Sequence, residues 1–332
     1  LLVDSLGTRI GGEERMTVRF TRGVSLLLCM GVTMAWTCEA GPNTIFNFLR
    51  NDVGARAAAL AGSFVTVTDD PTAVFYNPAS GGTLDTPRGS LGFLKQILDI
   101  NSGHVVYGQD VEDFGSITGG ILFTHYGSFT ETDETGTELG SFSAADIAVS
   151  LTYSNTFSEH LYYGATAKFI YSAIADYSST GLAADIGLLY RIPDSRASVG
   201  ASLRNMGVQT STYRGTNEDL PLDLSIGGSV VPRGIPLLLN LNFHRLNESA
   251  GSFGDRFRWF TVGAEFTLSS ALQLRFGYDN ARRKDLKIGT SAGLAGFTAG
   301  LGLTVSDYRI DYGINLLGEI GALHQISIAA SF

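Results

Sequence analysis

The sequence predicts an all-β fold: a transmembrane antiparallel β-barrel of about fourteen strands with an N-terminal plug segment inside it. Three observations lead to this prediction. Segment after segment alternates apolar and polar residues, which is the two-residue period of a strand whose faces meet different surroundings. Charged residues within these segments fall opposite the aromatic residues. The alternation also continues to the last residue, Phe332, although chain ends are usually polar and frayed.

Residues 1–40 differ from the rest of the chain. They are interpreted as an over-extension of the translated sequence upstream of the true start, followed by a signal peptide. Arg19 and Arg22 precede an apolar run over 23–35, and the small residues that signal peptidase requires follow it. The run is shorter than the about 20 apolar residues that a membrane-spanning helix needs. Met16 is interpreted as the true start, so the mature chain is expected to begin near Gly41.

Composition and motifs argue against several classes of function. Both cysteines, Cys29 and Cys38, lie in the predicted signal peptide, so disulfides and cysteine-bound metals are not expected in the mature chain. A net charge of -9 argues against a nucleic-acid partner. The five histidines are scattered, and the sequence has no metalloprotease, serine-hydrolase or nucleotide-binding motif. We therefore expect a protein without catalytic activity and without a cofactor.

The alternating segments are separated by turn residues, and they define the expected strands. Short turns, such as 193–195 and 269–270, alternate with longer polar loops, such as 130–138 and 209–219, and this asymmetry is typical of outer-membrane barrels. The first segment can belong to the plug instead, and 286–305 can be two strands. The segments lie near 61–70, 87–98, 103–110, 115–130, 139–156, 160–176, 181–191, 196–205, 221–231, 235–246, 257–268, 271–279, 286–305, 308–317 and 322–332.

The charged strand residues predict which face meets lipid. A Lys or Arg that faces lipid at mid-bilayer costs about 2–4 kcal/mol. Backbone in hydrocarbon must also satisfy its own hydrogen bonds, which only helices and closed sheets achieve. A soluble sandwich is the alternative, but the long series of strands and the aromatic residues at strand ends favour a barrel in the bacterial outer membrane. The candidate lumen-facing residues, which either line a permeation path or pair with one another, are Lys168, Glu265, Arg275, Arg309 and Asp311.

The segment before the first strand predicts a plug. Residues 44–60 are rich in alanine and suit a helix or a compact plug better than a strand. Asp70 is predicted to cap a short helix that begins at Pro71, and Pro78 is predicted to end it. Asp69 and Asp70 are alternatively a calcium or substrate contact, with capping the preferred role. The apolar residues that either contact a lipid-like substrate or pack the plug are Ile45, Phe46, Phe48 and Leu49.

The C-terminal strand predicts a role in assembly. Ile326, Ile328 and Phe332 lie on one face of a strand that ends on an aromatic residue, and this pattern resembles the signal read by the barrel assembly machinery. The same strand must pair with the first strand to remove the free edges of the sheet.

Several motifs carry a resemblance to a known family. The stretch "GARAAALAGSFVTVTDDPTAVFYNPAS" at 54–80 resembles the opening of PorV/PorQ family outer-membrane proteins and, more distantly, of FadL-type transporters. "ASLRNMG" at 201–207, "LPLDLSIGG" at 220–228 and "YRIDYGINLLGEIGALHQISIAASF" at 308–332 resemble later strands of the family. The resemblance spans 44–332 and departs from the family at "AGS", 61–63, where paired glycines are common.

The resemblance implies a barrel of about fourteen strands with a hatch-like segment inside it. The hatch-like segment would cover 41–60, and the barrel would cover 61–332. Within this hatch, 46–60 would match the family, and the family's NPA element would be Asn77, Pro78 and Ala79. The implied function is docking of secretion components or cargo domains in a type IX-like export system. The alternative is FadL-like uptake of hydrophobic small molecules. The implied partners are outer-membrane lipid, the assembly machinery, and either secretion proteins or a hydrophobic ligand.

Overall fold

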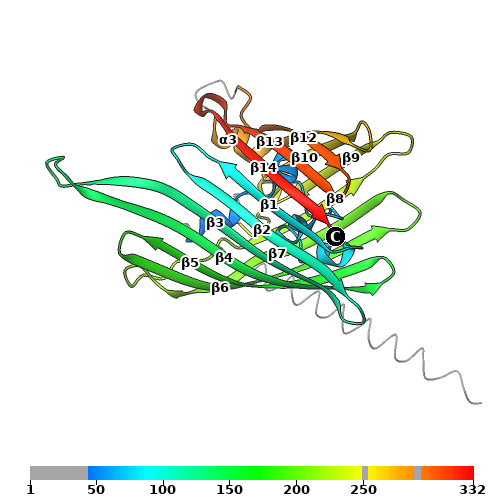
Figure 1. Cartoon of the computed structure of the whole chain (residues 1–332), viewed down its shortest axis with the longest axis horizontal. Helices are drawn as coiled ribbons and strands as arrows, with labels where there is room; N and C mark the ends of the chain where they lie inside the picture. The colour runs from blue at the N-terminus through cyan, green and yellow to red at the C-terminus, as the bar shows by residue number, and fades with distance from the viewer. Residues whose placement is uncertain (1–43, 249–252, 288–292) are drawn as a thin grey trace, which may run out of the picture. The chain divides into compact units, whose positions relative to one another are not determined.

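Within the residues that this computed structural model describes, 44–248, 253–287 and 293–332, fourteen antiparallel strands form a closed barrel (Figure 1). Each strand pairs with its neighbours in sequence, and β1 pairs with β14. The predicted signal peptide, with Met16, Cys29 and Cys38, lies outside the described residues. The strands are β1 (Arg88–Lys95), β2 (Asn101–Val111), β3 (Gly115–Thr132), β4 (Glu138–Ser158), β5 (Leu161–Ile174), β6 (Tyr177–Ile192), β7 (Ala197–Ser211), β8 (Asp223–Val230), β9 (Leu237–Phe243), β10 (Phe260–Thr267), β11 (Leu272–Asp279), β12 (Phe297–Val305), β13 (Tyr308–Leu316) and β14 (Ala322–Ser331).

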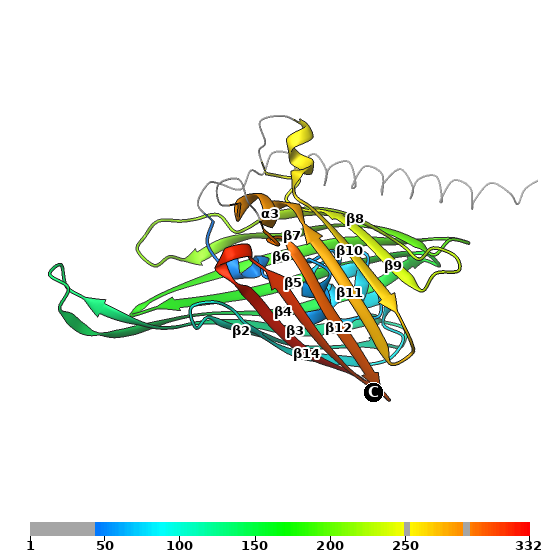
Figure 2. The same ribbon diagram turned by 90° about the horizontal axis from the view of Figure 1, so that it is seen from above.

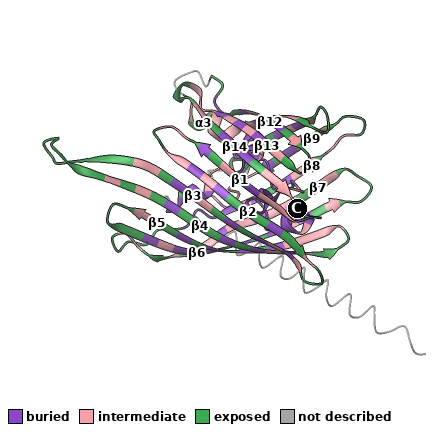
Figure 3. Cartoon of the chain, in the orientation of Figure 1, coloured by how far each residue is buried: buried purple, intermediate pink, exposed green. Residues whose placement is uncertain are grey.

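Buried and exposed residues alternate along the strands (Figure 3), and the two faces of the sheet differ in chemistry, as the alternation predicts. On β4, Val149 and Leu151 are exposed, whereas the intervening Ser150 and the following Thr152 are buried inside the barrel. Large apolar side chains also cover the outside of the other strands, and small polar residues dominate the inner wall. An exterior of this kind suits hydrocarbon, and the closed sheet leaves no edge unpaired there. The fold and localisation predictions are thus confirmed: the chain is an outer-membrane β-barrel.

The two ends of the barrel have different connections. Turns 112–114, 159–160 and 306–307 join strands at one end, called here the short-turn end. Connections 212–222, 244–259 and 280–296 lie at the opposite, long-loop end, which also carries α3 (Asn280–Asp285), η4 (Phe253–Arg258) and η5 (Gly318–Ile320). In outer-membrane barrels the short turns face the periplasm and the long loops face outward.

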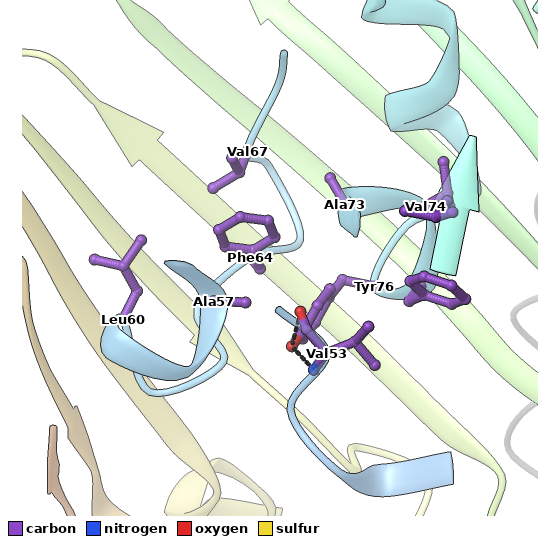
Figure 4. Packing of buried hydrophobic residues seen from close by; sticks show 10 residues of the cluster. Val53, Ala57, Leu60, Phe64, Val67, Ala73, Val74 and Tyr76 are labelled. Atoms are coloured by element: carbon purple, nitrogen blue, oxygen red, sulfur yellow. Dashed lines mark hydrogen bonds between the residues drawn. The ribbon is translucent and has the colours of Figure 1, made fainter. Parts of the chain in front are cut away.

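The segment before β1 fills the barrel, and Figure 2 shows it in blue between the strands. This plug contains η1 (Asn47–Arg50), α2 (Ala55–Ala59), η2 (Pro71–Phe75) and η3 (Pro78–Thr83). Its apolar core packs Phe64 against Tyr76, with ring centroids 5.3 Å apart, and the Val53 amide donates to the Tyr76 hydroxyl at 2.7 Å (Figure 4). The plug is therefore a small folded unit with a core of its own.

The predicted boundary between plug and barrel at residue 61 is wrong, and the alternative, that the first alternating segment belongs to the plug, is confirmed. Residues 61–70 form no strand; they are largely buried within the plug, and the first strand begins at Arg88. Ala61 and Gly62 have left-handed backbone, with φ of 54° and 71°, which stops regular extended structure. The alternation over 61–70 suggests a strand wrongly. This segment is buried mostly by other parts of the protein, so it carries apolar residues although it has no face toward lipid.

Other local predictions can be compared directly with the structure. Asp70 caps η2 by accepting a hydrogen bond from the Thr72 amide at 3.0 Å, as predicted. Pro78 differs from the prediction because it begins η3, which Asn77 caps. Segment 286–305 contributes one described strand, β12, and its residues 288–292 lie outside the described part of the chain.

Glycines on the inner wall let the plug approach closely. A Cβ added to Gly300 would lie 2.4 Å from the Ala59 side chain, and one added to Gly313 would lie 2.6 Å from the Ala55 carbonyl oxygen. Helix α2 therefore packs against a part of the wall where glycines leave room for it. Gly300 thus marks a close approach between the wall and the plug, and the alanines of α2 complete the fit.

We predict that Val149→Arg destabilises the barrel in membranes by about 2–4 kcal/mol, because Val149 faces outward near the middle of β4 and a lipid-facing cation is costly there. Urea unfolding in lipid vesicles measures the effect. Leu139→Arg, at an exposed site near the end of the same strand, is the matched control and should cost about 1 kcal/mol or less. Equal costs at both sites would contradict the assignment of the lipid face.

We also predict that Phe332→Ala lowers the folded, heat-modifiable fraction of the protein in outer membranes. The Phe332 ring lies 6.1 Å from that of Tyr107 on β2, so it spans β1 beside the closing strand pair, and alanine removes this contact while keeping the backbone hydrogen bond to Pro87. Ile326 and Ile328, on the same strand, are also exposed outward. Ser331→Ala is the control, and full insertion of the Phe332 variant would remove this role.

Candidate functional site

Six charges, four of them buried and two partly buried, form a closed ring between the plug and the barrel wall. Two come from the plug and four from strands β10, β11 and β13, and positive and negative side chains alternate around the ring. Neighbouring nitrogen and oxygen atoms lie 2.5 to 3.3 Å apart. In order around this charge ring, the residues are Arg56, Glu265, Arg275, Asp311, Arg309 and Asp70.

The ring explains how charges are tolerated inside the barrel. Arg56 meets Glu265 through two hydrogen bonds of 2.8 and 2.7 Å, and Arg275 bridges Glu265 and Asp311, each at 2.6 Å. Burial disfavours the ionised form of Asp70, but Arg309 and Arg56 outweigh this and hold the pKa of its carboxyl well below its usual range. Since an unpaired buried charge is strongly destabilising, the ring fixes α2 and η2 to the wall.

A second polar network surrounds Lys168. Its ammonium lies 2.6 Å from Asp185 and donates to the Asn205 side chain at 2.8 Å. Asn205 has left-handed backbone, with φ of 59°, at a bulge where β7 carries one more residue than β6. Nearby, Arg204 pairs with Asp223 at 2.5 Å and donates to the Phe75 carbonyl at 3.0 Å. This network ties η2 to the opposite side of the barrel.

The NPA element joins the plug to β4–β6. Asn77 donates to the carbonyls of Val65 at 2.9 Å and Leu188 at 3.0 Å, and its side-chain oxygen accepts from the Ala79 amide at 3.1 Å. The Pro78 carbonyl accepts from Ser154 at 2.7 Å. The structure therefore gives Asn77, Pro78 and Ala79 a docking contact between η3 and the wall.

An apolar row crosses the otherwise polar inner wall. In the strand register, Leu122 on β3 pairs with Ala148 on β4, Ala148 with Ile170 on β5, and Ile170 with Gly181 on β6. We call these four residues the apolar row. A buried polar row lies beside it toward the long-loop end, formed by Thr124, Asp146, Ser172 and Ser179.

The start of the plug packs against the apolar row. Phe46, Phe48 and Leu49 are buried, as is Ile45, and they share one apolar cluster with Ala148 and Ile170. The Phe46 ring fills the place of a missing side chain, because a Cβ on Gly181 would lie 2.7 Å from Phe46 Cε2. Phe46 also has φ of 59°, an unfavourable conformation for an aromatic residue. The ring of a residue with an unfavourable backbone conformation thus occupies an apolar site in the lumen.

Two of the cavities in the described part of the chain lie at opposite ends of the lumen. One, of about 610 Å³, lies at the short-turn end between the plug loop 66–69 and the ends of several strands. Another, of about 120 Å³, lies toward the long-loop end and is lined by Asp52, Arg204, Asp223 and His244, among others. No group of three or more side chains among the described residues is arranged to hold a metal ion. In the described part of the chain, no helix is long and apolar enough to cross a membrane.

Sequence reasoning reached some of these residues but not their partners. The structure places Lys168, Glu265, Arg275, Arg309 and Asp311 inside the barrel, where they form ion pairs. Arg56, Asp185 and Asn205 were not anticipated, and neither was the apolar row. A single arginine within the alanine-rich "GARAAAL" was the available signal for Arg56, because a charge in a buried segment needs a buried partner.

Together, the closed sheet and the internal plug define a plugged outer-membrane barrel. The closest description of its fold comes from solved structures, since neither the family models nor the curated proteins searched contain a match. The toluene transporter TbuX of Ralstonia pickettii is similar, with a TM-score of 0.57, 13% identity, and coverage of 84% of this chain and 98% of that one.

Two other solved structures agree. The monoaromatic hydrocarbon channel CymD has a TM-score of 0.54 and 11% identity, covering 87% of this chain and 99% of its own. A Pseudomonas aeruginosa FadL homologue has a TM-score of 0.50 and 11% identity, covering 84% and 98%. At these identities the likeness establishes a FadL-like barrel fold. It supports the more distant part of the expected resemblance and gives no support to the PorV/PorQ part.

We predict that Arg56→Gln loosens the plug and destabilises the barrel by about 3 kcal/mol, because Glu265 and Asp70 each lose a buried partner. Urea unfolding in vesicles measures the loss, and single-channel conductance should rise as the plug detaches more often. Arg233→Gln, in an exposed turn, is the control for the loss of one positive charge. Unchanged stability and conductance in Arg56→Gln would mean that the charge ring does not anchor the plug.

Proposed function

We propose that this barrel is an outer-membrane channel for the uptake of hydrophobic small molecules. The observation that carries the proposal is the apolar row inside a polar lumen, occupied by the ring of Phe46, whose backbone is in an unfavourable conformation. Polar rows on the same strands show that the inner wall has no general need for apolar residues. The fold adds support, because similar barrels are described as a toluene transporter and a monoaromatic hydrocarbon channel.

The physical basis is the transfer of apolar surface out of water. A hydrophobic solute gains about 25 cal/mol for each Å² of apolar surface that it buries. The apolar row offers such a surface, and Gly181 leaves room for an aromatic ring there. A solute that replaced Phe46 at this position would gain burial and would also release the unfavourable backbone conformation of Phe46.

The plug is secured unevenly, which suits this function. The charge ring and the Lys168 network hold α2 and η2, while 44–50 are joined to the long-loop end by fewer polar contacts. The Ile45 amide donates to the Asp219 carbonyl at 3.0 Å, and Arg50 pairs with Glu248 at 3.0 Å with both side chains partly exposed. We infer that 44–50 moves more readily than the rest of the plug.

The docking role expected from the PorV/PorQ resemblance has no comparable support. It would involve components or cargo of a type IX-like secretion system bound to the barrel. The structural likenesses are to channels, and the site described above is inside the barrel rather than on an exposed face. We therefore propose uptake in preference to docking. Recovery of a secretion component with the tagged barrel from solubilised outer membranes would reverse that preference.

The proposal is tested by measuring the uptake of toluene or a long-chain fatty acid. Cells that lack the protein are compared with the same cells in which the protein is expressed again. We expect Ile170→Asn to weaken solute binding by about 1 kcal/mol or more, because it places a polar amide in the apolar row. Ile170→Leu is the matched control and should retain uptake. Heat-modifiable migration verifies that each variant folds. Uptake that is the same in the knockout and the restored strain would reject the proposed function.

A further inference from the structure

The cavity of about 610 Å³ at the short-turn end, called here the mouth cavity, has an unusual charge. The plug loop 66–69 forms one side, and β1, β6–β10 and β13 contribute to the remainder. Two carboxylates, Asp69 and Glu265, line it. Five arginines also line it: Arg56, Arg88, Arg191, Arg196 and Arg309.

Three of these arginines are not neutralised. Arg56 and Arg309 belong to the charge ring, as does Glu265. Arg88, Arg191 and Arg196 form no ion pair with any described residue, and neither does the remaining carboxylate, Asp69. The mouth cavity therefore carries an excess of positive charge.

The contacts of these three arginines leave donors available. Arg88 donates to the backbone carbonyl of Asp69, and its Nε is buried without a hydrogen-bond partner. Arg191 donates to the Tyr162 hydroxyl at 3.2 Å and lies 5.0 Å above its ring. Arg196 is exposed in the turn between β6 and β7. Arg50 and Arg204 also have a buried Nε without a partner, although each pairs with a carboxylate, so it is the absence of an ion pair that distinguishes the mouth arginines.

The opposite end of the lumen is arranged differently. In the cavity toward the long loops, Arg204 pairs with Asp223 at 2.5 Å and Arg282 with Asp52 at 3.2 Å. Arg50, in the same cavity, pairs with Glu248. Each arginine that lines this cavity is thus matched with a carboxylate among the described residues, unlike Arg88, Arg191 and Arg196 at the mouth cavity. A partly dehydrated guanidinium group favours an anion, and its planar donors suit a carboxylate or a phosphate.

We propose that the mouth cavity binds the acidic group, a carboxylate or phosphate, of an amphipathic solute that passes through the lumen. The inference rests on the proposed uptake function and extends it to solutes that carry an anionic head on an apolar tail. The cavity has the volume of a small-molecule site, for which about 300–1,000 Å³ is usual. Arg88, Arg191 and Arg196 are the residues that would recognise the head.

Calorimetric titration of the full-length barrel in nanodiscs of zwitterionic lipid tests the site. The probes are octanoate, octyl phosphate, octanol, acetate and inorganic phosphate. We expect octanoate and octyl phosphate to bind more tightly than octanol, and Arg191→Gln/Arg196→Gln to weaken them about tenfold, as the loss of charge-assisted hydrogen bonds predicts. Octanol binding should not change. Arg233→Gln, which removes a charge from a turn at the same end but outside the cavity, should leave every affinity unchanged.

Each contrary result has a distinct meaning. Octanoate affinity that the double variant does not alter would overturn the anion site, while unchanged octanol binding and uptake would leave the proposed function intact. Acetate or inorganic phosphate bound as tightly as octanoate would also overturn the inference, because a free anion would then suffice. Absence of binding by octanol and octanoate alike would count against the uptake function itself. Arg196→Gln alone serves if the double variant folds poorly, because Arg196 is exposed.

Discussion

The constraint on which this structure depends is that hydrocarbon offers no partner to a backbone amide or carbonyl. A sheet in lipid must therefore close, and here β14 pairs with β1 to complete the barrel. Closure in turn creates an interior that has to be filled. The plug fills it, and this explains why the inner wall carries so many small residues: glycine and serine leave space for another layer of protein between opposing strands.

Electrostatics then decides how the plug is held. Apolar packing alone would let the plug slide, because it has little direction. The charge ring is directional: Arg56 meets Glu265 through two hydrogen bonds, and Asp70 faces Arg309. On the other side of the barrel, Arg204 contacts the Phe75 carbonyl. These anchors lie on α2 and η2, and we infer from this that the stretch 44–50 is the least constrained part of the plug.

The two proposed binding regions lie where the inner wall is not polar and where arginines are not paired with carboxylates. The apolar row departs from the polar inner wall, and Phe46 occupies it in an unfavourable conformation. The mouth cavity departs from the matching of charges, and Arg88 retains a buried donor without an acceptor there. An apolar surface and a cationic mouth at different depths of one lumen would suit a solute with a tail and a head.

The sequence by itself determined the barrel. Alternation, the charges opposite aromatic residues, and the C-terminal Phe332 are local consequences of strands that meet lipid on one face, so the strand segments from β1 to β14 were readable. It also placed Glu265 and Arg275 inside. Only the tertiary structure decided the partners: the ring that Arg56 completes, the apolar row and the extent of the plug. These features depend on strand register and on contacts between residues far apart in the chain, such as Arg56 with Glu265. A two-residue alternation of apolar and polar residues gives no information on either. Residues 61–70 show the same limit. An alternating pattern indicates that apolar side chains are kept from water, but it does not indicate whether lipid or protein covers them.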